Sequence, residues 1–494
     1  MALPRYLIFS SPRRAPDPWG EWLWQLVAEL VRQDVRPEVV LSTPCDATND
    51  AAITRSLEHG VVYTWLRPRR LCDGLFDASD YDELLRTFLA EQEASGVHYE
   101  SAIIHRWQGH GAMLAPRLQL ARIPTVAFLE DAWPVCPRRE LYSAQGETCR
   151  TLDRTRCMAC VAATWPELAG QTTGWDEAAM RQARTSLDAP DLILAATRSV
   201  RPLLDSLGIT RSRALGFPTS VQVTEPCVHR VRRPQADAAA RCRVGFIGEL
   251  SPPSGVDVLL DAFEQLPSDA FELRLFGPLT AYHGHEAGRA ARAARIRTAN
   301  VVHDSTAWNT ADLPGMLDQI DVLVAPELFG EPTAVVAEVA LRRGVFLVAS
   351  SETPGVRYVE HGVNGYEFRC GSATALRDAL VDCAALLGQH EASLTFPIQS
   401  PIRIVSDLLE ICRRLPLPPG APRGISHWSA DLGQRVHVVY AREGTSGALA
   451  YPMRWRDGAW QADATPRHLQ DADLLRTHVA RMLETPLRLR REFL

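Results

Sequence analysis

Residues 243–267 read RVGFIGELSPPSGVDVLLDAFEQLP. A short apolar run ends at Gly248, a polar loop follows, and apolar residues then recur at helical spacing from Val256 onward. Short apolar runs that alternate with longer amphipathic runs are typical of parallel strands covered by helices. The stretch therefore predicts the first strand, the first loop and the first helix of an α/β domain.

The same alternation continues to residue 412 and also fills the N-terminal part of the chain. It predicts two Rossmann-like domains, residues 1–222 and 240–412, and ligands of such domains bind at the carboxyl ends of the strands. We expect strands at 6–11, 37–43, 101–105, 124–130 and 191–197 in the first domain, and at 243–248, 272–277, 300–304, 321–326 and 345–350 in the second.

The composition changes after residue 412. The string PLPPGAPRG (416–424) is rich in helix breakers and is interpreted as a linker. Beyond it apolar and polar residues alternate around the pair Asp457-Gly458, which predicts a β-hairpin, and a final helix is expected at about 467–484. Residues 425–494 should therefore form a small β/α appendage, and the fold class is α/β with two Rossmann-like domains and this appendage.

Composition excludes several classes of protein. The 494 residues are 46% hydrophobic and 23% charged, which is typical of folded globular chains and excludes disorder. The net charge is −6, and without a basic stripe we expect no nucleic-acid partner. The sequence contains no lysine, so all 53 basic residues are arginine, and chemistry that needs a lysine amine is excluded.

No stretch reaches the roughly 18 apolar residues of a membrane span, and the N-terminus lacks a secretory pattern. Seven of the eleven cysteines are scattered, which favours reduced thiols and a cytoplasmic protein. The basic end RLRREFL (488–494) leaves two interpretations open, a solvated tail or peripheral association with an anionic membrane surface.

Four cysteines are clustered in the spacing C-x12-C-x7-C-x2-C, within residues 136–160: Cys136, Cys149, Cys157 and Cys160. Four thiolates with a closing C-x2-C suit tetrahedral zinc. Unligated thiols or a redox pair, and an iron–sulfur cluster, are the alternatives. A four-thiolate zinc leaves no open coordination position, so the metal would be structural and we expect no cofactor for catalysis.

A candidate anion site follows the fourth strand of the second domain. Glu331 precedes small and β-branched residues that open a helix, so their backbone N–H groups suit a diphosphate. Glu338 lies further along that helix, and a carboxylate is a natural partner for ribose hydroxyls. The candidate donor-binding residues are Gly248, Glu331, Thr333, Ala334, Val335 and Glu338.

Residues 243–267 and 320–365 together resemble the nucleotide-binding domain of retaining GT-B glycosyltransferases, glycosyltransferase family 4 or group 1 type. The matching residues are Gly248, Gly255, Val256, Asp257, Pro326, Glu331, Glu338, Gly344, Gly362, Asn364 and Gly365. The resemblance implies that Glu331 meets the donor sugar and that Glu338 meets the ribose. It also implies transfer with retention of anomeric configuration and without a catalytic metal.

Residues 103–142 resemble the acceptor-side domain of the same family. The matching residues are His105, Gly109, Asp131, Trp133, Cys136, Pro137 and Arg138. By this resemblance Asp131 and Arg138 shape the acceptor side and join Glu331 as the candidate catalytic residues. A subset of the family carries a similar cysteine loop after Cys-Pro-Arg.

Three positions depart from the family pattern: Glu249 and Ser254 stand where the family carries an Arg and a Lys, and Glu130 replaces a His. The leading hypothesis is a glycosyltransferase that moves a sugar from a nucleotide-diphosphate donor to a glycan, a lipid-linked or a small-molecule natural-product acceptor, for example in polysaccharide biosynthesis. The alternative is a catalytically inactive glycosyltransferase-like protein that binds or regulates another enzyme.

Overall fold

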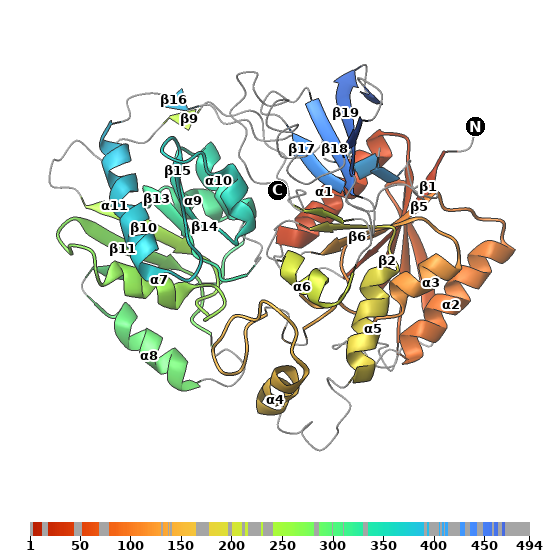
Figure 1. The fold of residues 1–494 in the computed structure, drawn as a ribbon, viewed down its shortest axis with the longest axis horizontal. Coiled ribbons are helices and arrows are strands. Elements are labelled where there is room, and N and C mark those ends of the chain that lie inside the picture. Colours follow the sequence, from red (N-terminus) through yellow and green to blue (C-terminus); the bar gives the residue numbers. More distant parts are fainter. Residues whose placement is uncertain are drawn as a thin grey trace.

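Two sheets, each with helices on both faces, form two lobes that lie side by side in the computed structural model (Figure 1). A third, antiparallel sheet lies beside the first lobe. The structure describes residues 3–11, 18–43, 52–68, 79–129, 132–136, 138, 141–164, 177–195, 200–209, 213–215, 229–230, 241–280, 286–298, 300–309, 311–329, 334–389, 393–394, 405, 408–409, 411–412, 425–429, 435–441, 448–456, 459–462 and 467–469.

The first lobe contains an eight-stranded sheet in the order β3-β4-β2-β1-β5-β6-β7-β8, in which only β3 is antiparallel to its neighbour. Its strands are β1 (Arg5–Ser10), β2 (Arg36–Ser42), β3 (Ile53–Glu58), β4 (Val61–Leu66), β5 (Ser101–Ile104), β6 (Thr125–Leu129), β7 (Leu192–Ala195) and β8 (Arg213–Leu215). Its helices are α1 (Pro18–Arg32), α2 (Ser79–Ala94), α3 (Leu114–Leu120), α4 (Arg154–Thr164), α5 (Glu177–Asp188) and α6 (Val200–Ser206).

The second lobe contains a six-stranded parallel sheet in the order β12-β11-β10-β13-β14-β15. Its strands are β10 (Cys242–Ile247), β11 (Phe271–Phe276), β12 (Val301–Asp304), β13 (Val322–Ala325), β14 (Phe346–Ser350) and β15 (Gly365–Phe368). Its helices are α7 (Val256–Phe263), α8 (Glu286–Ile296), α9 (Leu313–Leu317), α10 (Ala334–Arg342), the 3-10 helix η2 (Pro354–Tyr358) and α11 (Ala373–Gln389). A short antiparallel pair, β9 (His229–Arg230) and β16 (Ser393–Leu394), lies outside this sheet.

The two-domain α/β prediction is confirmed, and the expected strands of both lobes are found. Strands β3, β4, β8 and β15 were not predicted from the sequence. Strand β3 reads ITRSLE and its side chains are only partly buried, so its residues lack the apolar run that identified the central strands. Edge strands bury fewer side chains than central ones, which weakens their signal in the sequence.

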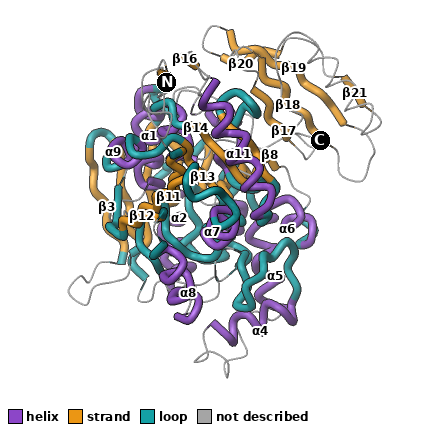
Figure 2. Tube along the Cα trace, turned by 90° about the vertical axis from the view of Figure 1, so that its left-hand side faces the viewer, coloured by secondary structure: helices purple, strands orange, loops and turns teal. Residues whose placement is uncertain are grey.

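The third sheet consists of β17 (Ile425–Ser429), β18 (Arg435–Ala441), β19 (Ala448–Arg456), β20 (Ala459–Ala462) and β21 (Arg467–Leu469). Antiparallel pairing of β19 with β20 confirms the predicted hairpin. The expected helix is wrong over 467–469, because these residues form β21 and pair with the part of β19 that β20 leaves open. The rest of that expected helix lies outside the described residues. Figure 2 shows this sheet at one end of the molecule, with β17 against the edge strand β8.

The end of the segment that we assigned to the second domain packs on the first lobe. Val405, Leu408, Leu409 and Cys412 are buried in the apolar cluster that also contains Leu26 of α1. Their burial removes apolar side chains from water, which stabilises this return of the chain to the first lobe. The two lobes are therefore joined by two separate stretches of chain.

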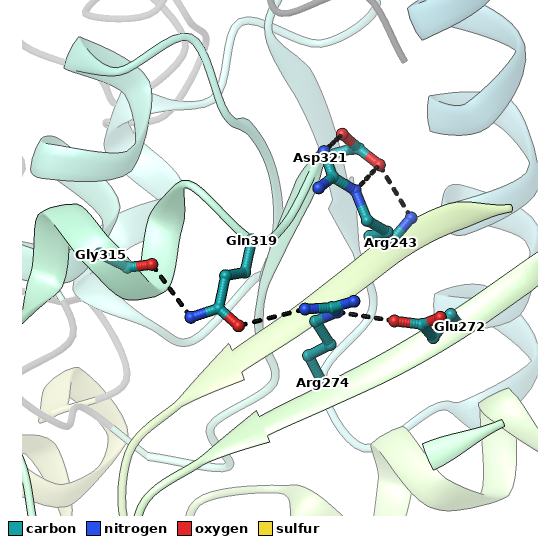
Figure 3. Close-up of polar contacts among 6 residues, drawn as sticks. All are labelled: Arg243, Glu272, Arg274, Gly315, Gln319 and Asp321. Carbon is teal, nitrogen blue, oxygen red and sulfur yellow. Dashed lines mark hydrogen bonds and ion pairs between the residues drawn. The ribbon is translucent and has the colours of Figure 1, made fainter. Parts of the chain in front are cut away.

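An ion pair fixes the two central strands of the second sheet where they begin. Asp321, just before β13, is buried and accepts hydrogen bonds from the backbone N–H of Arg243 at 2.9 Å and from its Nη2 at 2.5 Å (Figure 3). Nearby, Arg274 of β11 donates hydrogen bonds to Glu272 and to Gln319. Both of these partners are more exposed to solvent than Asp321 is. Arg243 and Asp321 thus hold β10 beside β13.

Candidate functional site

The order of the strands reverses between β10 and β13, because the chain first builds β11 and β12 on one side and then crosses to the other. In open parallel sheets ligands bind at the carboxyl ends of the strands that flank such a reversal. In this lobe those ends are Ile247 and Ala325. We call the loops that follow β10 to β14 the carboxyl edge of the second lobe.

The loops after β10 and β13 are in direct backbone contact. The N–H of Leu328 donates to the carbonyl oxygen of Pro253 at 3.0 Å. Gly255 begins α7 in a left-handed conformation, with φ of 74°, and a Cβ atom there would lie 2.0 Å from the carbonyl oxygen of Pro326. Only glycine permits this contact, which explains why Gly255 stands at the start of the helix.

A second close contact lies at Gly248, one of the predicted donor-binding residues. Its N–H donates to the carbonyl oxygen of Phe276 at 2.9 Å. Gly277 follows β11 with φ of 130°, and a Cβ atom there would lie 2.1 Å from the carbonyl oxygen of Gly248. Backbone, not side chains, therefore forms this part of the carboxyl edge, and Gly248 stays a predicted binding residue.

Glu249 and Ser254, at the positions of the departures from the family pattern, have different surroundings. Glu249 is exposed and accepts a short hydrogen bond from Thr280. Ser254 is buried, and its hydroxyl donates to the carbonyl oxygen of Ser251 at 2.7 Å, which closes the loop on itself. The loop after β10 thus presents a carboxylate and no cation.

Helix α10 begins at Ala334, and Val335 is buried in its first turn. Glu331 and Thr333 lie outside the described residues, so their roles stay predictions. Glu338 is fully buried, and its Oε1 lies 2.7 Å from Nη2 of Arg342, one turn further along the helix. The structure therefore places the predicted ribose partner in an ion pair inside the lobe.

Tyr358 lies beside this ion pair. Burial raises the pKa of Tyr358 to about 12, with Glu338 contributing to the rise and Arg357 and Arg342 opposing it. The guanidinium carbon of Arg357 lies 5.2 Å from the centre of the Tyr358 ring, and its three side-chain nitrogen atoms are buried. Two arginines, a carboxylate and a phenol thus form one cluster beneath the carboxyl edge.

The first lobe places buried polar side chains where β1 and β5 end. Ser10 Oγ lies 2.9 Å from Nδ1 of His105, and Tyr81 Oη lies 2.5 Å from Nδ1 of His110. Burial lowers the pKa of His105 to about 3 and that of His110 to about 4. Both imidazoles are therefore neutral at pH 7. The sequence analysis singled out His105 but missed its partner Ser10 and the pair of Tyr81 with His110.

Of the residues predicted to shape the acceptor side, Asp131 lies outside the described residues. Arg138 is buried, with 2% of its surface exposed, and it donates a short hydrogen bond to the Thr164 hydroxyl at the end of α4. This contact joins the two ends of the segment 136–164, which we call the cysteine loop. The acceptor-side role of Arg138 stays a prediction.

Cys149 and Cys157 each lie within electrostatic range of the other three clustered cysteines. Burial raises the pKa of Cys136 to about 12 and raises the pKa of Cys149 and of Cys157, and the N–H of Ala144 lies 3.1 Å from the sulfur of Cys160. Among the described residues, no three Cys, His, Asp or Glu side chains are arranged closely enough to hold a metal ion. This arrangement does not fit a four-thiolate centre, and zinc in the loop stays a prediction.

The cysteine loop reaches the second lobe. Arg150 Nη1 lies 3.6 Å from Oε1 of Glu352, which follows β14. Tyr142 is near the ion pair of Asp257 with Arg292; burial raises its pKa and Asp257 raises it further. The loop therefore extends along the carboxyl edge from the start of α7 to the end of β14.

An apolar contact joins the lobes at the same place. Phe329, in the loop after β13, is 5% exposed and belongs to the apolar cluster of the first lobe that includes Trp133 and Leu141. Burial of an aromatic side chain between lobes contributes more than an exposed ion pair does. Neither Phe329 nor Arg150 carries a sequence signal for this role, because both lie in loops without periodicity.

Comparison with known proteins finds one family match and several structures of similar fold. Residues 241–385 match the family model described as Glycosyl transferases group 1. No curated protein sequence shows significant similarity to the chain.

Among solved structures, the fold is similar to sucrose-phosphate synthase from Thermosynechococcus elongatus, with 15% identity, a TM-score of 0.51, and coverage of 83% of this chain and 99% of that one. It is also similar to an alpha,alpha-trehalose-phosphate synthase (UDP-forming) from Burkholderia vietnamiensis, with 15% identity, a TM-score of 0.51, and coverage of 83% and 99%. A third similar structure is the catalytic domain of starch synthase IV from Arabidopsis thaliana, bound to ADP and acarbose. It shows 12% identity, a TM-score of 0.51, and coverage of 82% of this chain and 94% of that one.

The two lobes with their carboxyl edges and these likenesses define a protein of the GT-B fold. The match to group 1 glycosyl transferases covers residues 241–385, which lie in the second lobe. Among the described helices, none combines the length and the apolar composition that crossing a membrane requires.

Proposed function

We propose that the protein transfers a sugar from a nucleotide-diphosphate donor to a glycan, lipid-linked or small-molecule acceptor, with retention of anomeric configuration, in the cytoplasm. The observation that carries the proposal is the match of residues 241–385 to group 1 glycosyl transferases, on a sheet whose strand order reverses between β10 and β13. The structurally similar starch synthase IV domain is bound to ADP, and the similar trehalose-phosphate synthase is UDP-forming. These likenesses support a nucleoside diphosphate as the leaving group.

In this proposal the donor lies against the carboxyl edge of the second lobe. The first turn of α10 directs backbone N–H groups at the diphosphate, and helix N-termini favour anions. Gly248 lets the backbone approach the donor closely, because it carries no Cβ atom, and Gly255 lets the loops after β10 and β13 meet at this edge. As the bond from the sugar to phosphate breaks, negative charge grows on the diphosphate, and fixed donors stabilise that charge.

The residues of the resemblance complete the proposal. Glu331 contacts the sugar, Glu338 contacts the ribose, and Asp131 with Arg138 forms the acceptor side. For Glu338 this requires that one carboxylate oxygen serves the ribose while Oε1 stays with Arg342. A carboxylate has room for both, since it accepts about four hydrogen bonds.

The experiment is a transfer assay with UDP-, ADP- and GDP-sugars, scored by release of the nucleoside diphosphate and by the anomeric configuration of the product in NMR. We expect release with one donor class and a product that keeps the donor's configuration. Glu338→Gln should reduce this release, and the matched control is Glu272→Gln, the same change of side chain on β11 near the amino edge of the same sheet, which should not. An inverted product would contradict retention, and no release with any donor would favour the second candidate.

The second candidate is a catalytically inactive glycosyltransferase-like protein that binds or regulates another enzyme. It is favoured by a specific set of observations on the donor loop: Glu249 is exposed there, and Ser254 turns its hydroxyl into the loop. A carboxylate near a diphosphate is repulsive. This candidate predicts that no nucleotide sugar binds and that a partner protein copurifies.

A further inference from the structure

The carboxyl edge of the second lobe is poor in cations. The loops after β10 to β14 contain a single arginine, Arg357, and no lysine, whereas they contain five glutamates: Glu249, Glu327, Glu331, Glu352 and Glu360. Arg357 is stacked on Tyr358 with its three side-chain nitrogen atoms buried. A diphosphate at this edge would therefore meet a negative field from its own lobe, and it needs a cation from elsewhere.

The cysteine loop of the first lobe brings an arginine to this edge. Arg150 is 65% exposed and lies 3.6 Å from Glu352, whose side chain is 21% exposed. The ion pair is long and open to solvent, so it holds the guanidinium weakly. Arg150 can exchange the carboxylate for another anion because most of its surface is accessible.

Cys370 connects this pair to the loop after β13, because its N–H donates to the hydroxyl of Ser351, the neighbour of Glu352, at 3.2 Å. The sulfur of Cys370 lies 3.8 Å from the carbonyl oxygen of Glu327 and 3.7 Å from that of Leu328. Burial raises the pKa of Cys370, and the charges of Glu352 and Arg150 act on the same thiol in opposite directions. Arg150 therefore lies near the loop that leads into α10, where the diphosphate is proposed to bind.

We infer that Arg150 of the cysteine loop binds the donor's diphosphate across the lobes and leaves Glu352 to do so. The inference rests on the proposed function. A guanidinium matches two phosphate oxygens at once, which a carboxylate-rich edge cannot do. The first lobe thus supplies the charge that the second lobe lacks, and donor binding draws the two lobes together.

The test is calorimetric titration of the full chain with UDP and with uridine, repeated with ADP and adenosine. We expect Arg150→Ala to weaken binding of the nucleoside diphosphate by about 10- to 100-fold, because the phosphate contact is lost. The affinity for the nucleoside should stay unchanged. Arg150→Lys should lie between. Arg154→Ala is the matched control, since Arg154 is an exposed arginine of the same loop, and it should bind like the wild type.

Glu352→Gln separates a phosphate contact from a structural ion pair. If Arg150 binds phosphate, this variant keeps or increases the affinity for the diphosphate, because the competing carboxylate is gone. If Glu352→Gln weakens the binding of UDP as much as Arg150→Ala does, the ion pair only joins the lobes and the inference is overturned. An unchanged affinity in Arg150→Ala, or binding that depends on Mg²⁺ and not on Arg150, also overturns it. No binding of any nucleotide to the wild type overturns the proposed function itself.

Discussion

Glu338 and Arg342 form an ion pair of 2.7 Å within helix α10, and their side chains are 0% and 9% exposed. A buried charge is tolerated when a partner and further hydrogen bonds compensate for lost water. The pair lies next to Tyr358. The ion pair holds the Glu338 carboxylate in one position, which a binding residue needs. It uses Oε1, one of the two carboxylate oxygens.

The contact between the loops after β10 and β13 depends on a missing side chain. Gly255→Ala would place Cβ 2.0 Å from the carbonyl oxygen of Pro326 in a left-handed backbone, and we expect a loss of about 2 kcal/mol or more in the free energy of unfolding. Urea unfolding measures it. The matched control is Gly315→Ala in α9, where a Cβ atom meets nothing within 4 Å, and it should be neutral or slightly stabilising. Equal losses would refute the proposed packing.

The ion pair at the start of β10 and β13 should contribute more to stability than the neighbouring pair of Arg274 with Glu272, whose carboxylate is less buried. Asp321→Asn leaves Arg243 without a charged partner, and we expect a loss of about 2–3 kcal/mol, below the range for fully buried pairs because Arg243 is 31% exposed. Arg274→Gln removes a more solvated pair and should cost less than about 1 kcal/mol. Urea unfolding at pH 7 measures both losses in the free energy of unfolding. A larger loss for Arg274→Gln than for Asp321→Asn would contradict the claim that Arg243 and Asp321 hold the two central strands together (Figure 3).

Acid should destabilise the first lobe before its carboxylates are protonated. The pKa values of His105 and His110, about 3 and about 4, lie below the value of about 6.5 for an unfolded chain. The unfolded state therefore binds more protons between these limits, so the free energy of unfolding falls as the pH drops from about 7 to about 4. The loss is on the order of 3 kcal/mol for each histidine.

Histidine NMR titration and denaturant unfolding at several pH values check this. Neither imidazole should titrate above pH 5 in the folded protein. His110→Asn should flatten the dependence of stability on pH, whatever its own cost at pH 7. A normal titration near pH 6.5 for both histidines would show that their burial is wrong.

The spacing of the four clustered cysteines predicts one zinc ion per chain, whereas the arrangement of their side chains in the structure predicts none. Plasma mass spectrometry on purified protein decides between the two. Zinc must displace the thiol protons, and burial raises the pKa of Cys136 to about 12, so retention should fall as the pH is lowered. Cys157→Ser combined with Cys160→Ser should abolish the metal. Cys383→Ser, in the core of the second lobe, is the control. Protein without zinc whose four thiols alkylate with no loss of folding would exclude the metal.

Apolar periodicity predicted the two sheets because their central strands are buried on both faces. PTVAFLE and DVLVAP are continuous apolar runs, and β6 and β13 lie there with every residue buried. Strand β3 and strand β21 could not be predicted in this way. Their residues alternate little, and β21 exists because β19 is longer than its partner β20.

For the candidate site, glycines were the most informative residues. Gly248 and Gly255 could be placed from the sequence because the residues around them resemble the family's nucleotide-binding domain, and the structure shows that the left-handed backbone of Gly255 beside Pro326 requires glycine. The partners of Glu338 and of Arg150 could not be predicted. The partner of Glu338 depends on the position of Arg342 one turn further along the helix. The partner of Arg150 depends on contact between two lobes that are distant in sequence.

The central claim is that the carboxyl edge of the second lobe binds a nucleotide-diphosphate sugar with Glu338 on its ribose. Titration calorimetry with UDP-, ADP- and GDP-glucose tests it most directly, on the wild type, Glu338→Gln and the control Glu272→Gln, each first shown to be folded. We predict binding of one donor to the wild type and to Glu272→Gln, and about 10-fold weaker binding to Glu338→Gln. Wild-type protein that binds none of the three, or Glu338→Gln that binds as well as the wild type, would contradict the claim.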